Sequence, residues 1–512
     1  VSQGIRSVKM KNQNLLDKCF VGFWFVCLVF LPAVWCNDQR VILSFCKNLP
    51  HPESCIFFLS QSPAGITDSL DSGNSLAVLL KLSQDQASHG LTYTHTLGPK
   101  CKDLKEVEAW NACLELYEDT VEQLYAINSK PCSGEDTQTW LSAALTNLRT
   151  CKVGFEELDV TTNVYPMISN NASYLISNCL ALNKGNETST KFVEGFPDWV
   201  KPGDRKLLQT RSANLVVAQD GSGNYKTVTE AVNAASGGGR FVIHVKAGEY
   251  NENVQIRKAN IMLVGDGIGK TVISSGRSVG SGSTTFRSAT VAVSGQGFIA
   301  QGITFRNAAG PGKSQAVALR SGSDRSVFYQ CGFEGYQDTL YVYTQRQFYK
   351  SCDIYGSVDF IFGNAAVVIQ SSNIYVRSAG NPFFTVTAQG RTDPNQNTGI
   401  VIHGCNIGGA SSGKAYLGRP WHQYSRTVVM KSNLGSVINS AGWHVWNGGF
   451  ALSTLYYAEY GNSGPGSSTS GRVSWPGYHV IGADVASKFT VGNFIVGGAW
   501  LPSTGVPYSA GL

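Results

Sequence analysis

The chain has 512 residues, of which 42% are apolar and only 15% are charged. That charge content excludes a coiled coil and a charge-driven disordered chain, and the 56 glycines follow no three-residue period, which excludes collagen. Residues 1–208 hold 18 Lys and Arg against 22 Asp and Glu, whereas residues 209–512 hold 23 against 13. We therefore predict two differently built domains. The positive charge of the second half favours a polyanionic partner, nucleic acid or an acidic polysaccharide, with a basic domain that has no special partner as the alternative.

The N-terminus has the pattern of an export signal. Residues 19–36 form an unbroken apolar run, and Arg6, Lys9, Lys11 and Lys18 precede it. A basic segment followed by such a run predicts a signal peptide or an uncleaved signal-anchor over 1–36, whereas a buried core helix is not expected there. Sequons at Asn171 and Asn186 fit glycosylation of an exported chain. We expect a secreted protein, anchored to a membrane of the secretory pathway if the signal is retained.

Residues 37–190 are predicted to be helical. Apolar residues recur at three- and four-residue steps over 103–127, a pattern typical of one helix face, and a similar pattern covers 139–148. The first set comprises Leu104, Val107, Trp110, Leu114, Tyr117, Val121 and Leu124. Short connections between such helices indicate a small bundle. No cluster of acid, base and nucleophile occurs in this half, which favours binding over chemistry.

Cysteines are concentrated in the helical half. Cys46 and Cys55 flank a short segment that a disulfide would close, and Cys113 and Cys151 lie at helix positions that a second bond would tie together. Spacing alone does not fix these pairs. Residues 191–209 are predicted to be a linker, because Pro202 and Gly203 stand next to a dibasic pair. Arg205-Lys206-Leu207-Leu208 is the predicted protease site.

Residues 210–512 contain a repeat. A short phrase recurs at Gly302-Ile303, Gly332-Phe333, Asp353-Ile354, Asn373-Ile374, Asn406-Ile407 and Asn433-Leu434. Its steps of 20–33 residues, with β-rich runs and no helical pattern, predict a β-solenoid. A β-sandwich, the competing all-β fold, predicts turns every 8–12 residues and no long period.

Stacking of the repeats selects a few polar residues. Residues one period apart lie on neighbouring coils about 4.8 Å apart. Cys331 and Cys352 are 21 residues apart and are expected to form a disulfide, and Asp338 and Asp359 have the same spacing. Gln315, Gln337 and Asp359 follow at steps of 22. Two carboxylates and two carboxamides are therefore expected on one face, where paired carboxylates separate into acid and base roles.

Other motifs in the basic half are weak. Residues 276–280 and 409–413 match the serine-hydrolase pattern G-x-S-x-G, and residues 265–271 approach a P-loop, but none has the strand and helix setting that its chemistry needs. The eight histidines show no ligand spacing, so neither a metal site nor a cofactor is expected.

Longer phrases in this half resemble those of plant pectin methylesterases. The matching segments run in order over nearly all of 210–512: 284–286, 315–319, 335–340, 356–364, 389–397 and 417–421. The resemblance implies a right-handed parallel β-helix. The helical half is similar to the inhibitor-like pro-region of the family, which implies a four-helix bundle, the two disulfides named above and cleavage at residues 205–208.

The resemblance also implies a role for each matching residue. Asp359 would be the nucleophile, and Asp338 would act first as general acid and then as base. Gln337 and Gln315 would donate to the oxyanion, and Arg419 would hold Asp359 ionised. Thr285 and Trp421 would contact the sugar chain.

The implied reaction is hydrolysis of methyl esters in methylated homogalacturonan, without a cofactor and with no nucleic acid as partner. A processing protease and a separate inhibitor protein are further implied partners. The segment between Asn397 and Leu417 is shorter than in many relatives, and Cys101, Cys132 and Cys179 are additional cysteines. A β-helix pectin lyase or glycosidase, or an inactive wall-binding protein, are the alternatives. The N-terminal half is predicted to be autoinhibitory.

Overall fold

The structure is a computed structural model that describes residues 39–62, 70, 73–129, 132–161, 172–184, 192–193, 196–197, 213–409 and 414–512. The predicted leader, the sequons at Asn171 and Asn186 and the predicted protease site at 205–208 lie outside the described residues. Within the part of the chain that is described, no helix is both long and apolar enough to cross a membrane.

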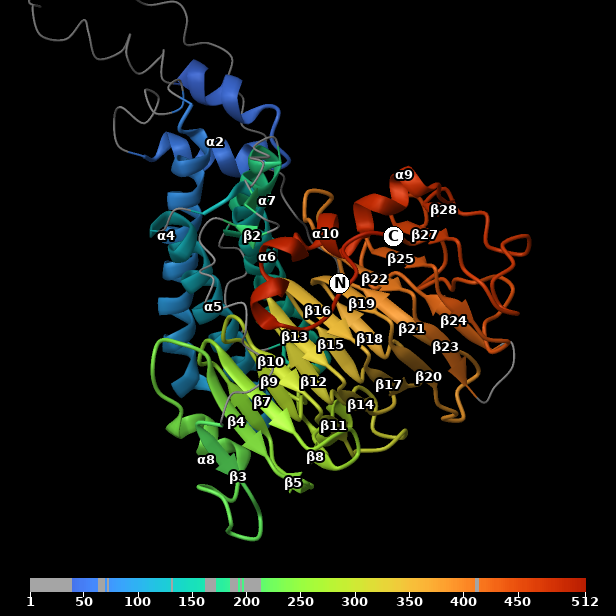
Figure 1. Ribbon diagram of the computed structural model, residues 1–512. Coiled ribbons are helices and arrows are strands. Elements are labelled where there is room, and N and C mark those ends of the chain that lie inside the picture. The colour runs from blue at the N-terminus through green and yellow to red at the C-terminus, as the bar shows by residue number, and fades with distance from the viewer. Residues whose placement is uncertain are drawn as a thin grey trace, which may run out of the picture.

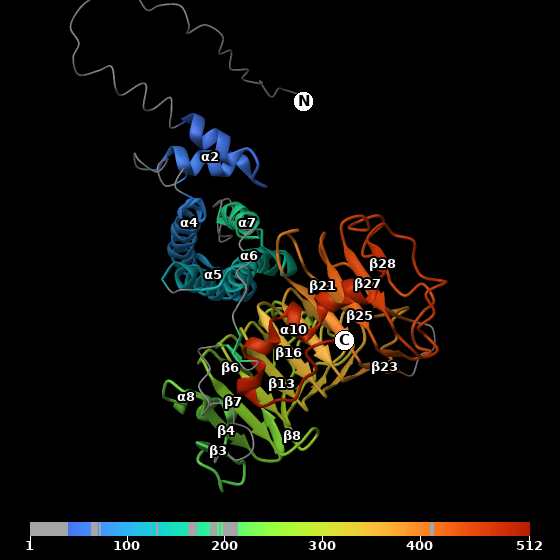
Figure 2. The same cartoon turned by 45° about the horizontal axis from the view of Figure 1, so that its top comes forward.

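Four long helices of the N-terminal half form the predicted bundle (Figures 1 and 2). Each packs against two others, so that they close a ring in the order α4, α5, α6 and α7. Ser133 begins α6 with a capping box, because its hydroxyl accepts from the amide of Asp136 and the Asp136 carboxylate accepts from the amide of Ser133. The helices are α2 (Pro52–Ser60), α4 (Ser75–Leu97), α5 (Leu104–Ser129), α6 (Gly134–Glu157) and α7 (Ala172–Asn183), with the 3-10 turn η1 (Gly98–Lys100) after α4.

The structure contains the disulfides Cys46–Cys55 and Cys113–Cys151, and the second joins α5 to α6. The helix predicted over 103–127 is confirmed as α5, but its predicted inner face is partly wrong. Leu104 is 86% exposed and Val107 is 36% exposed, whereas Glu115 is buried. The reason is that α5 packs both against the other helices and against the other domain, where basic residues contact its acidic side.

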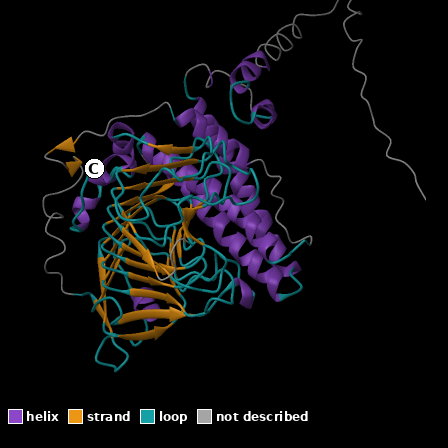
Figure 3. Cartoon of the chain, turned by 90° about the vertical axis from the view of Figure 1, so that its right-hand side faces the viewer, coloured by secondary structure: helices purple, strands orange, loops and turns teal. Residues whose placement is uncertain are grey.

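Residues 213–512 form a parallel β-helix whose coils each contribute a strand to up to three sheets (Figures 1 and 3). Strands in these sheets pair in parallel, and the crossover connections of such a stack are right-handed. An eleven-stranded sheet contains β3 (Leu215–Val217), β4 (Phe241–Val245), β7 (Ile261–Gly265), β10 (Ile299–Gln301), β13 (Ser326–Tyr329), β16 (Arg346–Lys350), β19 (Ala366–Gln370), β22 (Gly399–His403), β25 (Arg426–Met430), β27 (Tyr456–Tyr460) and β28 (Tyr478–Val480).

The two smaller sheets complete the coils. The eight-stranded sheet contains β5 (Gly248–Asn251), β8 (Thr271–Ser275), β11 (Thr304–Asn307), β14 (Gly332–Glu334), β17 (Asp353–Gly356), β20 (Asn373–Val376), β23 (Asn406–Gly409) and β26 (Asn433–Leu434). The seven-stranded sheet contains β6 (Val254–Ile256), β9 (Val291–Val293), β12 (Leu319–Ser321), β15 (Leu340–Val342), β18 (Ile361–Gly363), β21 (Phe384–Gln389) and β24 (Ala415–Gly418).

Short elements lie around this core. They are β1 (Phe192–Val193), which pairs antiparallel with β2 (Phe196–Pro197), and α8 (Val228–Ala234), η3 (Val279–Ser281), α9 (Ala483–Ala486), η4 (Ser487–Phe489), α10 (Val491–Phe494), η5 (Gly497–Ala499) and η6 (Leu501–Thr504).

The predicted repeat is confirmed in five of its six copies. From Gly332 to Asn433 the first residue of each phrase pairs with the first residue of the next, in the eight-stranded sheet. The first copy is wrong by two residues, because Thr304 and not Gly302 pairs with Gly332. Gly302 has φ of +66° and occupies the coil corner that Gln330 fills, with φ of +52°, one coil later. The sequence pattern therefore predicts the start of a strand at Gly302, which instead occupies a corner of the coil.

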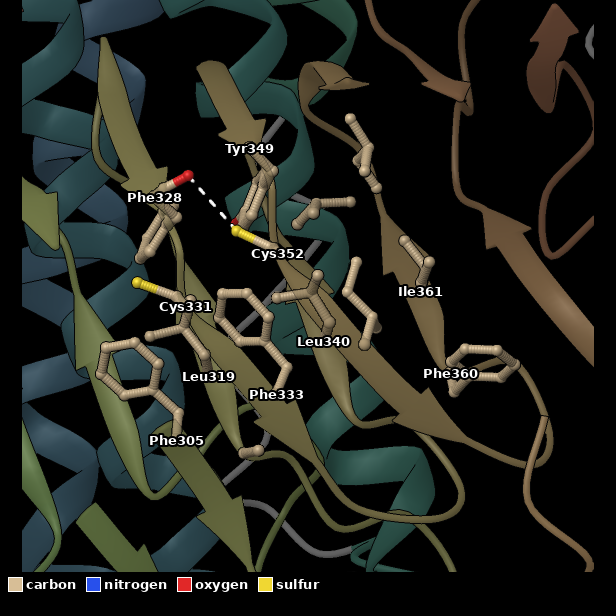
Figure 4. Close-up of a cluster of buried hydrophobic side chains, with 14 of the residues drawn as sticks. Phe305, Leu319, Phe328, Cys331, Phe333, Leu340, Tyr349, Cys352, Phe360 and Ile361 are labelled. Carbon is tan, nitrogen blue, oxygen red and sulfur yellow. Dashed lines mark hydrogen bonds between the residues drawn. The ribbon is translucent and has the colours of Figure 1, made fainter. Parts of the chain in front are cut away.

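The interior of the β-helix is a ladder of stacked aromatic rings (Figure 4). Phe305 stacks on Phe333, and Phe328 stacks on Tyr349, with ring centroids 5.6 and 4.6 Å apart. Such offset contacts add to the burial of these large apolar side chains. They fix the spacing of the coils on which the polar residues stand.

The predicted bond between Cys331 and Cys352 is absent. The two residues stack one coil apart, as the spacing predicts, but both are buried free thiols. Each sulfur instead donates to a backbone carbonyl at 3.4 Å: Cys331 to Tyr329, and Cys352 to Phe328. The second of these bonds is drawn in Figure 4. No disulfide includes the described residues Cys101, Cys132, Cys179 or Cys405.

The bundle lies along one side of the β-helix (Figure 3). Apolar residues on and beside the seven-stranded sheet join the hydrophobic core of the bundle, among them Tyr341 and Phe362 in its strands and Phe286 and Tyr343 next to them. The predicted polar residues stand at the edge of this same covered face.

Candidate active site

One cavity brings together all seven residues for which catalytic or substrate-binding roles are predicted. It has a volume of about 450 Å³ and lies where the coils enter the seven-stranded sheet. The turns before β9, β12, β15 and β18 supply Thr285, Gln315, Gln337 with Asp338, and Asp359, and the segment after β24 supplies Arg419 and Trp421. The four turns belong to successive coils, because β9, β12, β15 and β18 are neighbours in the sheet.

Asp359 is paired with Arg419. Arg419 donates from Nε to Oδ1 at 2.8 Å and from Nη2 to Oδ2 at 2.6 Å, a bidentate pair that is nearly buried. The Thr385 hydroxyl donates to Oδ1 at 2.6 Å and accepts from the Asp359 amide at 2.9 Å. The carboxyl group is therefore fixed in orientation.

Asp338 lies in the same place one coil earlier and forms no ion pair with any residue that the structure describes. Both aspartates have left-handed backbones, with φ of +62° at Asp338 and +51° at Asp359, so the two turns repeat one geometry. Burial raises the pKa of Asp338 well above its ordinary value, and the charges of Asp359 and then Glu157 raise it further, while Arg419 opposes them. The surroundings of Asp338 therefore favour its protonated form, whereas Asp359 is paired with a guanidinium.

Gln315 and Gln337 stand on adjacent coils. The amide of Ala316 donates to the Gln337 carbonyl at 3.2 Å, which fixes the relative position of the two turns. Neither side-chain amide is hydrogen-bonded to another residue within the described part of the chain, so both remain available to a ligand in the cavity.

Aromatic rings form the cavity wall on the side of Arg419. The guanidinium carbon of Arg419 lies 4.4 Å from the ring centre of Trp446 and 5.5 Å from that of Phe383, both cation–π contacts. Trp421 packs edge-on against Phe362, with centroids 5.8 Å apart. This wall gives a flat apolar surface beside the charged pair.

Several residues of the cavity were missed by the sequence-based predictions. Thr385 lies one coil above Asp359 but 26 residues away, because residues 377–383 lengthen that coil beyond the period of 21 to 22. Trp446 follows the last strand of the seven-stranded sheet and has no repeat partner to mark it. Only the longer coil length could have pointed to Thr385.

The helical bundle also contributes residues to the wall of the cavity. Val153, Glu156 and Glu157, at the end of α6, line the same space as the two aspartates. Glu157 accepts from the Thr285 amide at 2.9 Å and from the Thr285 hydroxyl at 2.7 Å. The bundle therefore closes the cavity over the predicted substrate-binding residues.

Ion pairs also join the two domains outside this cavity. Glu115 on α5 lies 2.9 Å from Arg320 and 3.5–3.6 Å from Arg257 and Arg287. Burial acts to raise the pKa of Glu115, but these three arginines together hold it below its ordinary value. Asp136 on α6 lies 2.6 Å from Arg346. The acidic face of the bundle thus meets the basic face of the β-helix.

Comparison with known proteins assigns both halves. The family model described as pectinesterase matches residues 214–498, and the model described as plant invertase/pectin methylesterase inhibitor matches residues 40–182. Pectinesterase 2 of Citrus sinensis is 57% identical over 484 residues, which cover 92% of this chain and 95% of that protein. The chain belongs to the pectinesterase family. It is therefore a carboxylic ester hydrolase with an inhibitor-like domain ahead of its catalytic unit.

Further relatives place this pectinesterase among plant proteins that combine the two domains. Probable pectinesterase/pectinesterase inhibitor 17 of Arabidopsis thaliana is 55% identical over 507 residues, 96% of this chain and 98% of that protein. The solved pectin methylesterase from carrot is 55% identical with a TM-score of 0.58, and it covers 59% of this chain and 99% of its own length. The enzyme from Aspergillus niger, at 34% identity and a TM-score of 0.51, covers 57% and 97%.

No metal site accompanies these residues in the part of the chain that the structure describes. None of the described His, Cys, Asp and Glu side chains gather in groups of three that could hold an ion.

Proposed function

We propose that the protein removes methyl groups from pectin, hydrolysing galacturonosyl methyl esters to free carboxylates and methanol. The observation that carries the proposal is the contrast between two aspartates in one cavity. Asp359 is held by a bidentate pair with Arg419, whereas burial raises the pKa of Asp338 well above its ordinary value. An ester needs such a nucleophile together with a proton for the departing alkoxide.

In the proposed first step, an Asp359 oxygen attacks the ester carbonyl carbon and forms a tetrahedral intermediate. The amides of Gln315 and Gln337 donate to its oxyanion. When the intermediate collapses, the carbon–methoxy bond breaks and the methoxy oxygen takes the Asp338 proton, so that methanol leaves. An acyl-enzyme, an anhydride between Asp359 and the uronate, remains.

In the second step, Asp338 is a carboxylate and takes a proton from water. The hydroxide formed adds to the uronate carbonyl carbon, and the bond to Asp359 breaks. The products are a uronic acid, which releases its proton to solvent and becomes a uronate, and the ionised Asp359, and Asp338 is again protonated. Trp421 and the aromatic wall are proposed to stack on the sugar rings, and the basic domain suits a product that becomes more acidic.

We further propose a domain organisation for the whole chain. Residues 1–36 act as signal peptide or signal-anchor, 37–190 as pro-region, 191–209 as linker with a protease site at 205–208, and 210–512 as catalytic β-helix. Export would bring the enzyme to the plant cell wall and expose Asn171 and Asn186 to glycosylation. A separate inhibitor protein would compete for the surface that the bundle covers.

The pro-region is proposed to be autoinhibitory. Residues of α6 line the catalytic cavity, and ion pairs of Glu115 and Asp136 hold the bundle in that position. A polymer chain cannot lie in a groove that a helix already fills, so removal of the bundle should open the site.

Methanol release from methylated pectin tests the proposal. The full chain and the chain cut by a protease within 198–209 are compared, with solution viscosity followed in parallel. We expect methanol from the cut chain at a rate at least about tenfold above that of the intact chain, with unchanged viscosity. Loss of viscosity without methanol would instead support a lyase or glycosidase, and neither change would support a wall-binding protein.

Gln337→Ala should lower kcat in the cut chain by about a hundredfold or more, since one oxyanion donor is lost. KM should change little, because the amide acts mainly on the intermediate. Gln423→Ala is the control, since Gln423 is an exposed neighbour of Trp421 that does not line the cavity. Equal rates in Gln337→Ala and in the unsubstituted chain would contradict an oxyanion role.

A further inference from the structure

A further cavity between the two domains is lined mainly by polar and basic side chains. It has a volume of about 330 Å³, which is within the size range of small-molecule sites. Its basic residues are Lys184 after α7, Arg346 at the start of β16, Arg391 after β21, Arg426 at the start of β25 and Lys488 in η4. Among the described residues, Glu135 in the first turn of α6 is the only acid that lines it. The cavity therefore has an excess of positive charge.

Two of the three guanidiniums form no ion pair. Arg346 lies 2.6 Å from both Asp136 and Asp324, so its charge is compensated. By contrast, neither Arg391 nor Arg426 forms an ion pair with any residue that the structure describes. Two positive charges of this cavity are therefore left without a direct partner.

Backbone carbonyls hold these two guanidiniums in place. Arg391 donates from Nε to the Gln396 carbonyl at 2.9 Å and from Nη2 to the Pro394 carbonyl. Arg426 donates from Nε to the Thr398 carbonyl at 2.7 Å and from Nη2 to the Gln396 carbonyl at 3.4 Å, so the two guanidiniums share one acceptor and lie close together. Neither Nη1 group donates to a described residue. Because both side chains line the cavity, these N–H groups are available to a ligand in it.

Burial makes such a pair of like charges costly. It lowers the pKa of Arg391 to about 10 and that of Arg426 well below its ordinary value, which the charge of Arg391 lowers further. Asp393 opposes the effect at Arg391, but its carboxylate already accepts from the Ser177 hydroxyl and the Asn395 amide. A bound anion would remove this cost, because a buried charge is stable where an opposite charge and hydrogen bonds replace water.

The walls of the cavity come from both domains and are joined by hydrogen bonds. Gln138 of α6 donates to the Asn395 carbonyl at 2.6 Å, and Nδ2 of Asn397 donates to the Thr139 hydroxyl at 2.9 Å. Because α6 begins at the cavity, the positive end of its dipole adds to the charge of the arginines. An anion bound here would contact both domains and would therefore stabilise their docked arrangement.

We propose that this cavity binds a small multivalent oxyanion at the guanidiniums of Arg391 and Arg426, and that the bound anion stabilises docking of the helical bundle on the β-helix. Two oxygens of a phosphate or a carboxylate accept from neighbouring N–H groups of a guanidinium, whereas chloride offers a single point of contact. The cavity shares no described lining residue with the catalytic cavity. The proposal is therefore independent of the ester chemistry proposed above.

Titration calorimetry on the full chain tests the proposal, with inorganic phosphate and citrate as separate probes and sodium chloride at matched ionic strength as the blank. We expect saturable binding of at least one probe with a Kd of about 1 mM or lower, and a melting temperature that rises with its concentration. Tighter binding of phosphate would assign the site to a tetrahedral oxyanion, and tighter binding of citrate would assign it to a polycarboxylate. Absence of saturable binding of both probes overturns the proposal.

Substitutions of exposed residues place the bound anion in this cavity. Lys184→Ala removes a cation and should weaken binding of the tighter probe about threefold, whereas Glu135→Gln removes the acid and should strengthen it about threefold. Lys105→Ala is the matched control, because Lys105 is an exposed lysine of α5 that does not line the cavity. The proposal is also overturned if Lys184→Ala and Glu135→Gln both bind the probe as Lys105→Ala does.

Arg391→Gln should weaken binding by about tenfold or more, because a charged donor of the site is lost. Its thermal unfolding without added anion is recorded as well, since Arg391 also donates to the carbonyls of Pro394 and Gln396. Unchanged binding in folded Arg391→Gln would contradict the proposal. If this variant does not fold, the substitutions at Lys184 and Glu135 still decide the outcome.

Discussion

Asp359→Asn should abolish methanol release from methylated pectin, with a loss of at least about 10⁴-fold in kcat. An amide in this position is uncharged and cannot attack the ester carbonyl. The geometry would be largely kept, because Thr385 can still donate to the remaining oxygen. Arg419 loses its partner carboxylate, so thermal unfolding of the variant is recorded beside its activity.

Asp353→Asn is the matched control for this experiment. Asp353 stands on the same coil but points out of the eight-stranded sheet, where Asn373 donates to it at 2.9 Å. Asparagines occupy the equivalent position of the next three coils, at 373, 406 and 433. The control should therefore retain full activity. More than about 1% residual activity in folded Asp359→Asn would rule out Asp359 as the nucleophile.

Asp119→Asn should strengthen docking of the bundle at pH 8 and change it little at pH 4. Asp119 lies on α5 in a cavity of about 360 Å³ between the domains. Burial raises the pKa of Asp119 to about 7, Glu115 and Glu122 add to this, and Arg320 and Arg257 oppose it. Asparagine resembles the protonated acid, so the substitution removes the cost of a buried charge.

The direction of this effect follows from the raised pKa. The docked state binds the Asp119 proton more tightly than the separated bundle, where the pKa returns towards 3.8. Docking is therefore favoured below pH 4 and weakens as the pH rises to 7. A pKa shift of about three limits the change in the dissociation constant of the two domains to about 10³-fold. Because Asp119 is partly exposed, the expected change is about ten- to a hundredfold.

The comparison of variants is needed because other groups at the interface act differently. Burial lowers the pKa of His422, beside Arg149 of α6, to about 3, so docking over it weakens as the pH falls below 6.5. The lowered pKa values of Glu115 and Asp136 likewise weaken docking in acid, whereas the raised pKa of Glu157 acts with Asp119. These contributions to docking are the same in the unsubstituted protein and in Asp119→Asn.

The measurement uses the chain cut within the linker, with bundle and β-helix separated by size-exclusion chromatography at pH 4 and pH 8. At pH 8 the dissociation constant of the bundle from the β-helix should be at least about tenfold higher for the unsubstituted protein than for Asp119→Asn. Identical dissociation of the two proteins at pH 8 would show that Asp119 does not titrate on docking.

Much of the catalytic cavity could be predicted from the sequence, because a β-helix converts sequence spacing into distance. Asp338 and Asp359 are 21 residues apart and therefore stack in adjacent turns, as do the residues around Gln315 and Gln337. The spacing fails where a coil changes length, as it does before Thr385. It also fails at a corner, where Gly302 was mistaken for the first residue of a strand.

Sequence spacing predicted the Cys331–Cys352 disulfide and the buried face of α5 less well than it predicted which residues stack. Cys331 and Cys352 stack as predicted, yet the rotamers of both thiols are set by nearby carbonyls and no disulfide forms. The inner face of α5 was assigned from apolar residues alone, although Glu115 on the buried side meets three arginines of another domain. Apolar periodicity cannot reveal a buried face that is stabilised by charge.

The sequence by itself determined the two-domain composition, the stacked coils and the identity of the acids and amides that meet on them. Those features depend on local periodicity and on neighbouring coils, which the order of residues encodes directly. Only the tertiary structure decided that the end of α6 enters the catalytic cavity and that Glu157 meets Thr285, 128 residues away. Docking of one rigid domain on another follows from the shape and charge of whole surfaces, and no sequence period relates the residues that it brings together.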